Sequence, residues 1–285
     1  MTSLGEVIGQ IEARFKENNL CYGHGSDNPW DEAVALVLGV TEFPDDEAAL
    51  VEPVSGELQR QINGMATRRI EERIPLAYLL GKANFAGYEF LIEPGVVIPR
   101  SPIAQLVVQR FAPWLLTDPR NIVDVCCGSG CIGIACARQF PDSAVLLIDN
   151  DPRAVDLARR NVALHRLSDR VTVLNSDLFA AVDDQVFDVV VSNPPYVDAV
   201  DMSSLPAEYR HEPEPGLAAG VDGLDIIGRL LAELPQRLAD KGTFVCEAGG
   251  SASALLRKYP RLPFIWPDLL DGGEGVFLLQ TPSAR

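Results

Sequence analysis

The chain has 285 residues, of which 47% are hydrophobic, so it can bury one large core and still form a small second domain. Forty acidic residues against 24 basic ones give a formal net charge of −16, which repels phosphate backbones and disfavours a nucleic-acid substrate. The first residues lack the apolar centre of a signal peptide, and no apolar stretch of about 18 residues occurs. We therefore expect a cytoplasmic protein without a membrane span.

Residues 1–74 are predicted to form a small helical domain. Ile8, Ile11 and Phe15 repeat on one face of a first helix, and a second apolar segment follows an Asn-Pro pair. A third helical segment is expected from 56 to 73.

The pattern changes at residues 75–100, where apolar residues alternate around Gly87 and predict a β-hairpin linker. In residues 101–285, apolar runs alternate with helical segments, which is typical of a parallel sheet covered by helices on both faces. Two final apolar runs flank Gly272 and Gly273 and predict a closing hairpin. The five predicted strands of the sheet carry the runs NIVDV, AVLLIDN, RVTVLNSD, FDVVVSN and GTFVCEAG.

A glycine-rich turn, DVCCGSGCIGIA, follows the first of these strands. Gly128, Gly130 and Gly133 have the spacing G-x-G-x-x-G, and glycine is required where the backbone turns tightly against a ligand. Asp149 ends the next strand, where its carboxylate can accept both hydroxyl protons of a ribose. The glycine spacing also fits a purely structural turn or a nicotinamide-dependent oxidoreductase. Asp124, however, would repel a pyrophosphate and suits a ligand with a positive centre.

S-Adenosylmethionine has both a ribose and a cationic centre, so we expect it as the cofactor and S-adenosylhomocysteine as its product. Cys126, Gly128 and Gly130 of the turn, together with Asp124, would hold its amino acid end.

The adenine end is expected at Asp177, which follows the third strand and would meet the adenine amine. Leu178 or Phe179 would lie against the adenine ring. Two structural alternatives remain open. Asp149 could instead cap the helix that begins near Pro152, and Asp177 could be a solvent-exposed loop residue.

Four cysteines lie between Cys126 and Cys136, but no C-x-x-C pair is present and His165 is far along the chain. We therefore expect reduced, packed thiols and no metal site.

The segment SNPPYV follows the fourth predicted strand, at the edge of the sheet where ligands bind. An amide or aromatic amine is a weak nucleophile because its lone pair is delocalised. The side-chain oxygen of Asn193 and the carbonyl of Pro194 can accept its two N–H groups, and Tyr196 can stack on the planar group. We expect these three residues to be catalytic by orientation, without a general base, and Asn193 also to contact the cofactor. The alternative is a proline-rich loop that only ends a strand.

The glycine turn, Asp149, NPPY and the stretch RIPLAYLLGKANFAGYEF resemble the protein-glutamine methyltransferases that act on the translation apparatus. The resemblance covers about residues 70–280. It implies a class I S-adenosylmethionine-dependent methyltransferase fold, with a Rossmann-like, mostly parallel seven-stranded sheet, and a helical N-terminal domain that binds the target. It further implies that Pro195, Tyr196, Arg100 and Ser101 contact the substrate.

Two stretches, IPRSPIAQL and AEYRHEPEPGLAAGVDGLDI, resemble the branch that methylates the third protein of the large ribosomal subunit. A basic ribosomal protein, free or in an early assembly particle, is the partner that this resemblance and the acidic charge imply. Cys126 departs from the family pattern, which has glycine there. Residues 198–223 could close over the substrate or form a solvated loop, and His211 within them is a weak candidate for a base.

Several alternative functions are compatible with the same residues. Release factors could be the methylated proteins, or an adenine amine of nucleic acid could be the acceptor, although the net charge of −16 disfavours the latter. The glycines and Asp149 alone would also fit a nicotinamide-dependent oxidoreductase. A non-enzymatic scaffold of ribosome assembly is the remaining alternative.

Overall fold

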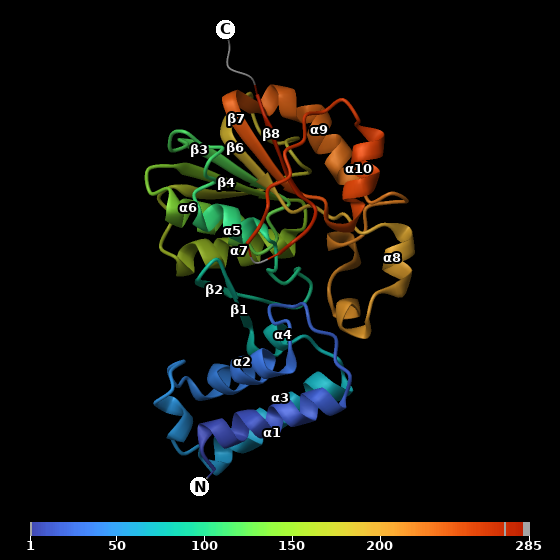
Figure 1. Cartoon of the computed structure of the whole chain (residues 1–285). Helices are drawn as coiled ribbons and strands as arrows, with labels where there is room; N and C mark the ends of the chain where they lie inside the picture. Colours follow the sequence, from blue (N-terminus) through green and yellow to red (C-terminus); the bar gives the residue numbers. More distant parts are fainter. Residues whose placement is uncertain (1, 271, 282–285) are drawn as a thin grey trace.

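The computed structural model describes residues 2–270 and 272–281, and begins with three helices packed on one another (Figure 1). Their shared core includes Ile8, Phe15, Leu36 and Ile62, all fully or almost fully buried. Ser3 starts the first helix with a capping box, in which its side chain and that of Glu6 satisfy each other's backbone N–H groups. The helices are α1 (Leu4–Glu17), α2 (Pro29–Thr41) and α3 (Gly56–Glu71), with a short 3₁₀ turn η1 (Ala49–Val51).

A short helix and a hairpin connect this part to the rest of the chain. Helix α4 (Leu76–Leu80) ends at Gly81, whose φ of +72° is the left-handed conformation that favours glycine. Strands β1 (Lys82–Phe85) and β2 (Tyr88–Leu91) then pair antiparallel across a tight turn at Gly87.

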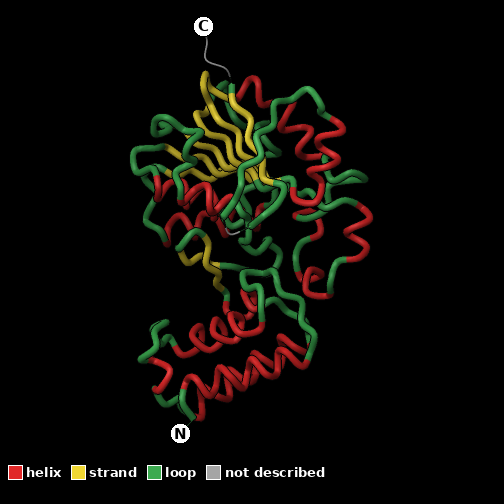
Figure 2. Tube along the Cα trace, viewed as in Figure 1, coloured by secondary structure: helices red, strands yellow, loops and turns green. Residues whose placement is uncertain are grey.

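The larger part contains a sheet, drawn in yellow in Figure 2. Its six strands lie in the order β5-β4-β3-β6-β7-β8, and only β8 runs antiparallel to the others. The expected seventh strand is reduced, within the described residues, to a single antiparallel bridge between Ile265 and Leu278. The predicted closing hairpin around Gly272 and Gly273 therefore exists only as this bridge. The strands are β3 (Asn121–Val125), β4 (Ala144–Asp149), β5 (Val171–Asn175), β6 (Phe187–Ser192), β7 (Leu238–Glu247) and β8 (Val276–Gln280).

Helices cover both faces of the sheet, because successive strand residues point to opposite sides. Ile122 and Val189 pack with α5, α6 and α7 on one face, whereas Val123 and Val190 pack with α9 and α10 on the other. The helices are α5 (Ile103–Val108), α6 (Cys131–Gln139), α7 (Pro152–Leu164), α9 (Asp225–Arg237) and α10 (Ala252–Lys258), with the 3₁₀ turn η4 (Gly249–Ser251) before α10.

The segment between β6 and α9 is largely ordered rather than a plain loop. It contains α8 (Ala199–Ser204) and the 3₁₀ turns η2 (Ala207–His211) and η3 (Glu214–Gly216). We call residues 207–218 the strap. The strap extends from the sheet toward the N-terminal helices (Figure 1). No helix within residues 2–270 and 272–281 is long and apolar enough to cross a membrane.

Candidate active site

A cavity lies at the carboxyl ends of β3, β4, β5 and β6, where open parallel sheets bind ligands. Residues from six segments, within 95–100, 126–128, 148–154, 176–178, 193–197 and 213–217, contribute to its wall together with Ile226 of α9. The predicted site residues that line it are Arg100, Cys126, Gly128, Asp149, Asp177, Leu178, Asn193, Pro194, Pro195 and Tyr196. Asp124, Gly130 and Ser101 do not line it.

The glycine turn between β3 and α6 needs glycine for two different reasons. Gly128 (φ +54°) and Gly130 (φ +81°) adopt the left-handed conformation, and Gly130 is the residue from which α6 begins. Gly133 has an ordinary backbone, but a Cβ there would lie 2.2 Å from a methyl carbon of Leu147, so helix and sheet could not pack as closely.

Cys126 occupies the first position of this turn with φ +61°, a left-handed conformation that is unfavourable for a non-glycine residue. Its side chain lines the cavity, and burial raises the pKa of its thiol. The thiol is therefore neutral and occupies space where the family pattern has glycine. The six cysteines are free thiols, and no cluster of three or more His, Cys, Asp or Glu suited to a metal ion occurs among the described residues.

Asp124 is placed differently from the expectation that it faces a cationic cofactor. It is fully buried behind the turn, and its Oδ2 accepts a hydrogen bond from the N–H of Gly133 at 2.8 Å. Burial raises its pKa to about 8, so the group is mostly protonated at pH 7. Asp124 thus supports the start of α6 from behind the turn and does not line the cavity, and its expected role toward the cofactor stays a prediction.

Asp149 lies at the end of β4 and lines the cavity as predicted. Its Oδ2 accepts the N–H of Gly128 at 2.8 Å, and its Oδ1 accepts the N–H of Asp151 at 2.9 Å. The helix cap that was the alternative role for Asp149 is provided by Asp151, whose side chain accepts from Arg153 N. Burial raises the pKa of Asp149, while the N–H donors from Asp151 and Gly128 oppose that rise.

Of the three residues expected near the adenine, two line the cavity and one lies in the core. Asp177 lines the cavity but is exposed, and its Oδ2 accepts a hydrogen bond from Arg229 at 2.9 Å. Leu178 is buried, has a φ of +50° and lines the cavity. Phe179 instead packs in the core beside Phe187, which leaves Leu178 as the apolar side chain on this wall.

Asn193 and Pro194 follow β6 directly and lie on the cavity wall. The Oδ1 atom of Asn193 is buried and has no hydrogen-bond partner among the described residues. A buried acceptor without a partner costs free energy, so such an atom indicates a ligand that donates to it.

Tyr196 is held by a residue that the sequence analysis did not identify. Its hydroxyl donates to Glu247 Oε1 at 2.7 Å, and the hydroxyl of Ser101 donates to Glu247 Oε2 at 2.5 Å. Ser101 is buried outside the cavity wall and supports Tyr196 through Glu247, so its expected contact with the substrate stays a prediction. Its position at a strand end could have revealed Glu247 in the sequence, because Glu247 ends β7 just as Asp149 ends β4.

Arg100 lines the cavity but its guanidinium is already engaged. Both of its terminal nitrogens bond the carboxylate of Glu212, at 2.6 and 2.7 Å. This bidentate pair fixes the side chain in one orientation. Arg100 is therefore part of the cavity wall, with its charge balanced by Glu212. His211 lies away from the cavity wall, with its Nε2 bonded to the carbonyl of Glu72 at 2.9 Å, so it is not placed to act as a base.

Comparison with known proteins identifies two close relatives over nearly the whole chain. A "Ribosomal protein uL3 glutamine methyltransferase" of Francisella tularensis subsp. tularensis (strain SCHU S4 / Schu 4) is 44% identical over 92% of this chain and 85% of its own length. A protein of the same name from Bordetella pertussis (strain Tohama I / ATCC BAA-589 / NCTC 13251) is 38% identical over 98% of this chain and 95% of its own length.

Two further comparisons concern the sheet domain and the fold. The family model of the "Methyltransferase small domain" matches residues 103–207. The crystal structure of the hMettl16 catalytic domain, in complex with MAT2A 3'UTR hairpin 6, has a TM-score of 0.54 at 16% identity and covers 88% of this chain and 93% of its own. This likeness concerns the fold alone.

The sheet order, the cavity at the strand ends and the glycine turn are those of a class I S-adenosylmethionine-dependent methyltransferase. With relatives at 38–44% identity over most of its length, the chain belongs to the ribosomal protein uL3 glutamine methyltransferase family. The family resemblance inferred from the sequence is confirmed, and the oxidoreductase alternative is set aside.

Proposed function

We propose that this protein transfers a methyl group from S-adenosylmethionine to the side-chain amide of a glutamine in ribosomal protein uL3. The names of the two relatives support the reaction and its substrate. The observation that carries the chemistry in this chain is the buried, unpartnered Oδ1 of Asn193 on the cavity wall.

The residues on the other side of the cavity fit the cofactor. When bound, S-adenosylmethionine supplies an electrophilic methyl group on a sulfonium. Asp149 offers a carboxylate for the ribose hydroxyls, because its two N–H partners leave further acceptor capacity on both oxygens. Gly128 has no side chain, so its backbone in the turn could be approached by the amino acid end, beside the thiol of Cys126. Asp177 and Leu178, which also line the cavity, would contact the adenine.

Asn193, Pro194 and Tyr196 would act on the glutamine amide by orientation. One amide N–H donates to Asn193 Oδ1 and the other to the Pro194 carbonyl, so the nitrogen lone pair points away from both acceptors and toward the incoming methyl group. Tyr196, which Glu247 fixes, and Pro195 would flank the plane of the amide. One amide proton would become acidic only as the methyl group is transferred and would then pass to water, while Asn193 and Pro194 hold the amide, so no residue has to act as a base beforehand.

The target is proposed to be free uL3 or an early assembly particle in the cytoplasm, because a glutamine buried in a finished subunit could not reach a cavity at the sheet edge. Nucleic acid is disfavoured as a direct substrate by the net charge of −16.

The N-terminal helices and the hairpin frame a groove lined by apolar and by acidic side chains, and we propose that residues 1–74 use it to dock a basic segment of uL3. The apolar lining includes Trp30, Leu38 and Phe43, and the acidic lining, which we call the acidic rim, includes Asp31, Asp45, Glu47 and Glu89. Lys82 on the same rim is neutralised by Glu89 at 3.0 Å. An acidic rim attracts a cationic segment and repels nucleic acid.

A transfer assay with labelled methyl tests the proposed function. Purified uL3, mature ribosomes, a release factor and RNA are offered in parallel, and the labelled residue is located by mass spectrometry. We expect label on a glutamine side chain of free uL3. Preferential labelling of the release factor would reassign the substrate, and label on an adenine amine would contradict protein-glutamine methylation altogether.

A further inference from the structure

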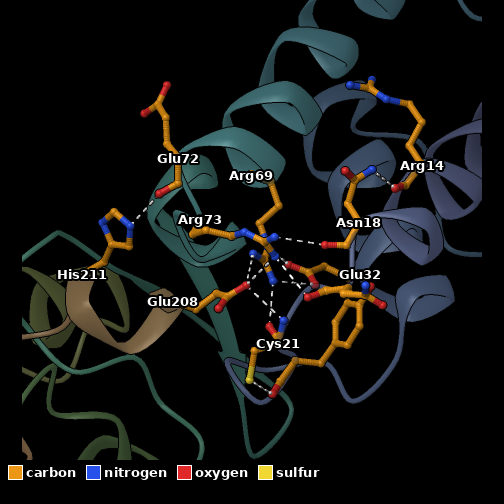
Figure 3. A network of polar contacts seen from close by, with 11 residues as sticks. Arg14, Asn18, Cys21, Glu32, Arg69, Glu72, Arg73, Glu208 and His211 are labelled. Atoms are coloured by element: carbon orange, nitrogen blue, oxygen red, sulfur yellow. Dashed lines mark hydrogen bonds and ion pairs between the residues drawn. The ribbon is translucent and has the colours of Figure 1, made fainter. Parts of the chain in front are cut away.

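A buried ionic cluster, whose residues do not line the cavity, joins the N-terminal helices to the strap (Figure 3). Its centre is Arg69 on α3, which is 1% exposed. Arg69 Nε donates to Glu32 Oε1 at 2.7 Å, and Arg69 Nη1 donates to Glu208 Oε1 at 3.2 Å. Glu32 belongs to α2, whereas Glu208 belongs to the strap. One buried cation is thus shared by two carboxylates from opposite sides of the domain interface.

Glu208 makes further contacts that fix the strap on the N-terminal helices. Its Oε1 also accepts the N–H of Cys21 at 3.0 Å and a hydrogen bond from Arg73 Nη1 at 3.4 Å. Glu208 is 2% exposed. Burial of a carboxylate requires such compensation, because an unpaired buried charge is strongly destabilising.

The next residues of the strap continue this docking toward the cavity. The Tyr209 ring lies 4.4 Å from the His24 ring between centroids, and the guanidinium of Arg100 lies 5.3 Å from the Tyr209 ring centroid. Glu212 then forms the bidentate pair with Arg100, with His24 Nε2 at 3.5 Å on the other side.

After Glu212 the strap becomes part of the cavity wall. Pro213, Gly216 and Leu217 line the cavity beside the NPPY segment. Leu217 is tied directly to that segment, because its carbonyl accepts the N–H of Val197 at 2.9 Å. The strap also lies close against the linker, since a Cβ on Gly216 would be 2.6 Å from Val97 Cγ2.

We propose that Glu208 is a positioning residue for methyl transfer: by anchoring the strap to the N-terminal helices, it holds the acceptor-side wall of the cavity against NPPY. This inference rests on the proposed function. The strap is hydrogen-bonded to Val197, which follows NPPY, whereas among the described residues no hydrogen bond joins it to Asp149 or Gly128. We therefore expect it to act on the glutamine acceptor more than on the cofactor. Small displacements of an acceptor lower transfer rates strongly, because reaction needs aligned atoms.

The cluster provides a matched pair of variants. Glu208→Ala removes the carboxylate by which the strap contacts Arg69 and leaves Arg69 paired with Glu32. Glu32→Ala removes the carboxylate of α2 and leaves Arg69 paired with Glu208 of the strap. Both variants remove one buried partner from the same cation, so both are expected to lower the thermal unfolding temperature. Only loss of Glu208 should disturb the cavity wall.

The experiment measures unfolding temperature, S-adenosylhomocysteine affinity by calorimetry, and kcat and KM for transfer to uL3 in both variants and in Glu208→Gln. We expect Glu208→Ala to lower kcat about tenfold with cofactor affinity within about twofold of wild type. Glu32→Ala should keep kcat within about twofold, and Glu208→Gln, which retains an acceptor, should lie between Glu208→Ala and wild type. Should Glu208→Ala not fold, Glu208→Gln against Glu32→Ala decides the question.

Unchanged kcat in the folded Glu208 variants, or an equal loss in Glu32→Ala, would overturn the positioning role. Absence of transfer to uL3 by the wild-type protein would instead refute the proposed function, so the two failures are distinguishable.

Discussion

At the scale of single residues, Asp149 is the residue proposed to bind the ribose of the cofactor. It ends β4, its carboxylate is held by two backbone N–H groups, and it lines the cavity from there. A charged acceptor for ribose hydroxyls in such a setting contributes about 1.5–3 kcal/mol to binding. Asp149→Ala should therefore weaken S-adenosylhomocysteine binding by that amount in calorimetry.

Asp149→Asn is the control for this prediction, because it keeps the shape and one acceptor for the turn. A folded Asp149→Ala protein with wild-type affinity would remove Asp149 from the cofactor site.

The sequence predicted the place of a site residue well when that residue lies directly at the end of a strand. Asp149 and Asn193 each lie at the end of a recognisable buried strand, so their place at the sheet edge followed from the pattern. Asp124 is the last residue but one of its strand, and its buried side chain accepts a hydrogen bond from the N–H of Gly133. Ser101 and Glu247 are 146 positions apart and meet only after folding, so no local pattern could reveal their contact.

At the scale of elements, the strap shows what sequence periodicity misses. It has no long helix or strand, and its contacts reach partners such as Cys21, which is 187 positions away from Glu208. The sheet strands, by contrast, are long apolar runs and were readily predicted. The seventh strand was overestimated because the segment between α10 and β8 forms only the Ile265–Leu278 bridge in the described residues.

The ion pair at the end of the strap predicts an acid-sensitive contact. Burial alone would raise the pKa of Glu212, but hydrogen bonds and charge from His24 and Arg100 lower it to about 2. A carboxylate with a depressed pKa in the folded state stabilises the protein fully above its unfolded pKa of about 4.5, and this stability is lost as the pH falls toward 2. We expect the free energy of unfolding, measured in urea, to decline between pH 5 and about pH 2–3.

Glu212→Gln should reduce the slope of that decline, since the variant cannot take up the proton. An acid limb as steep in Glu212→Gln as in the wild type would show that other groups dominate the acid response.

At the scale of the whole molecule, the proposed docking groove and the cavity lie in different parts of the chain. The groove is on the helical part and the cavity at the sheet edge, with the hairpin and strap between them (Figure 1). If the acidic rim docks uL3, replacing Asp45 and Glu47 by lysine should raise KM for uL3 about tenfold and leave kcat unchanged. Wild-type KM should itself rise with added salt.

The matched control reverses Asp183 and Asp184, which are exposed and precede β6 at the opposite edge of the sheet. An equal rise of KM in both charge-reversal proteins would mean that the net charge of the protein, and not the groove, determines binding of uL3.

The central claim is that Asn193 Oδ1 accepts a hydrogen bond from the amide that is methylated. It is tested most directly by measuring S-adenosylhomocysteine affinity and the single-turnover transfer rate to uL3 on the same preparation of Asn193→Ala. Loss of a preorganised acceptor costs about a hundredfold or more in rate. We predict that loss in rate together with nearly wild-type affinity, whereas near-normal turnover would contradict the catalytic role of the NPPY segment.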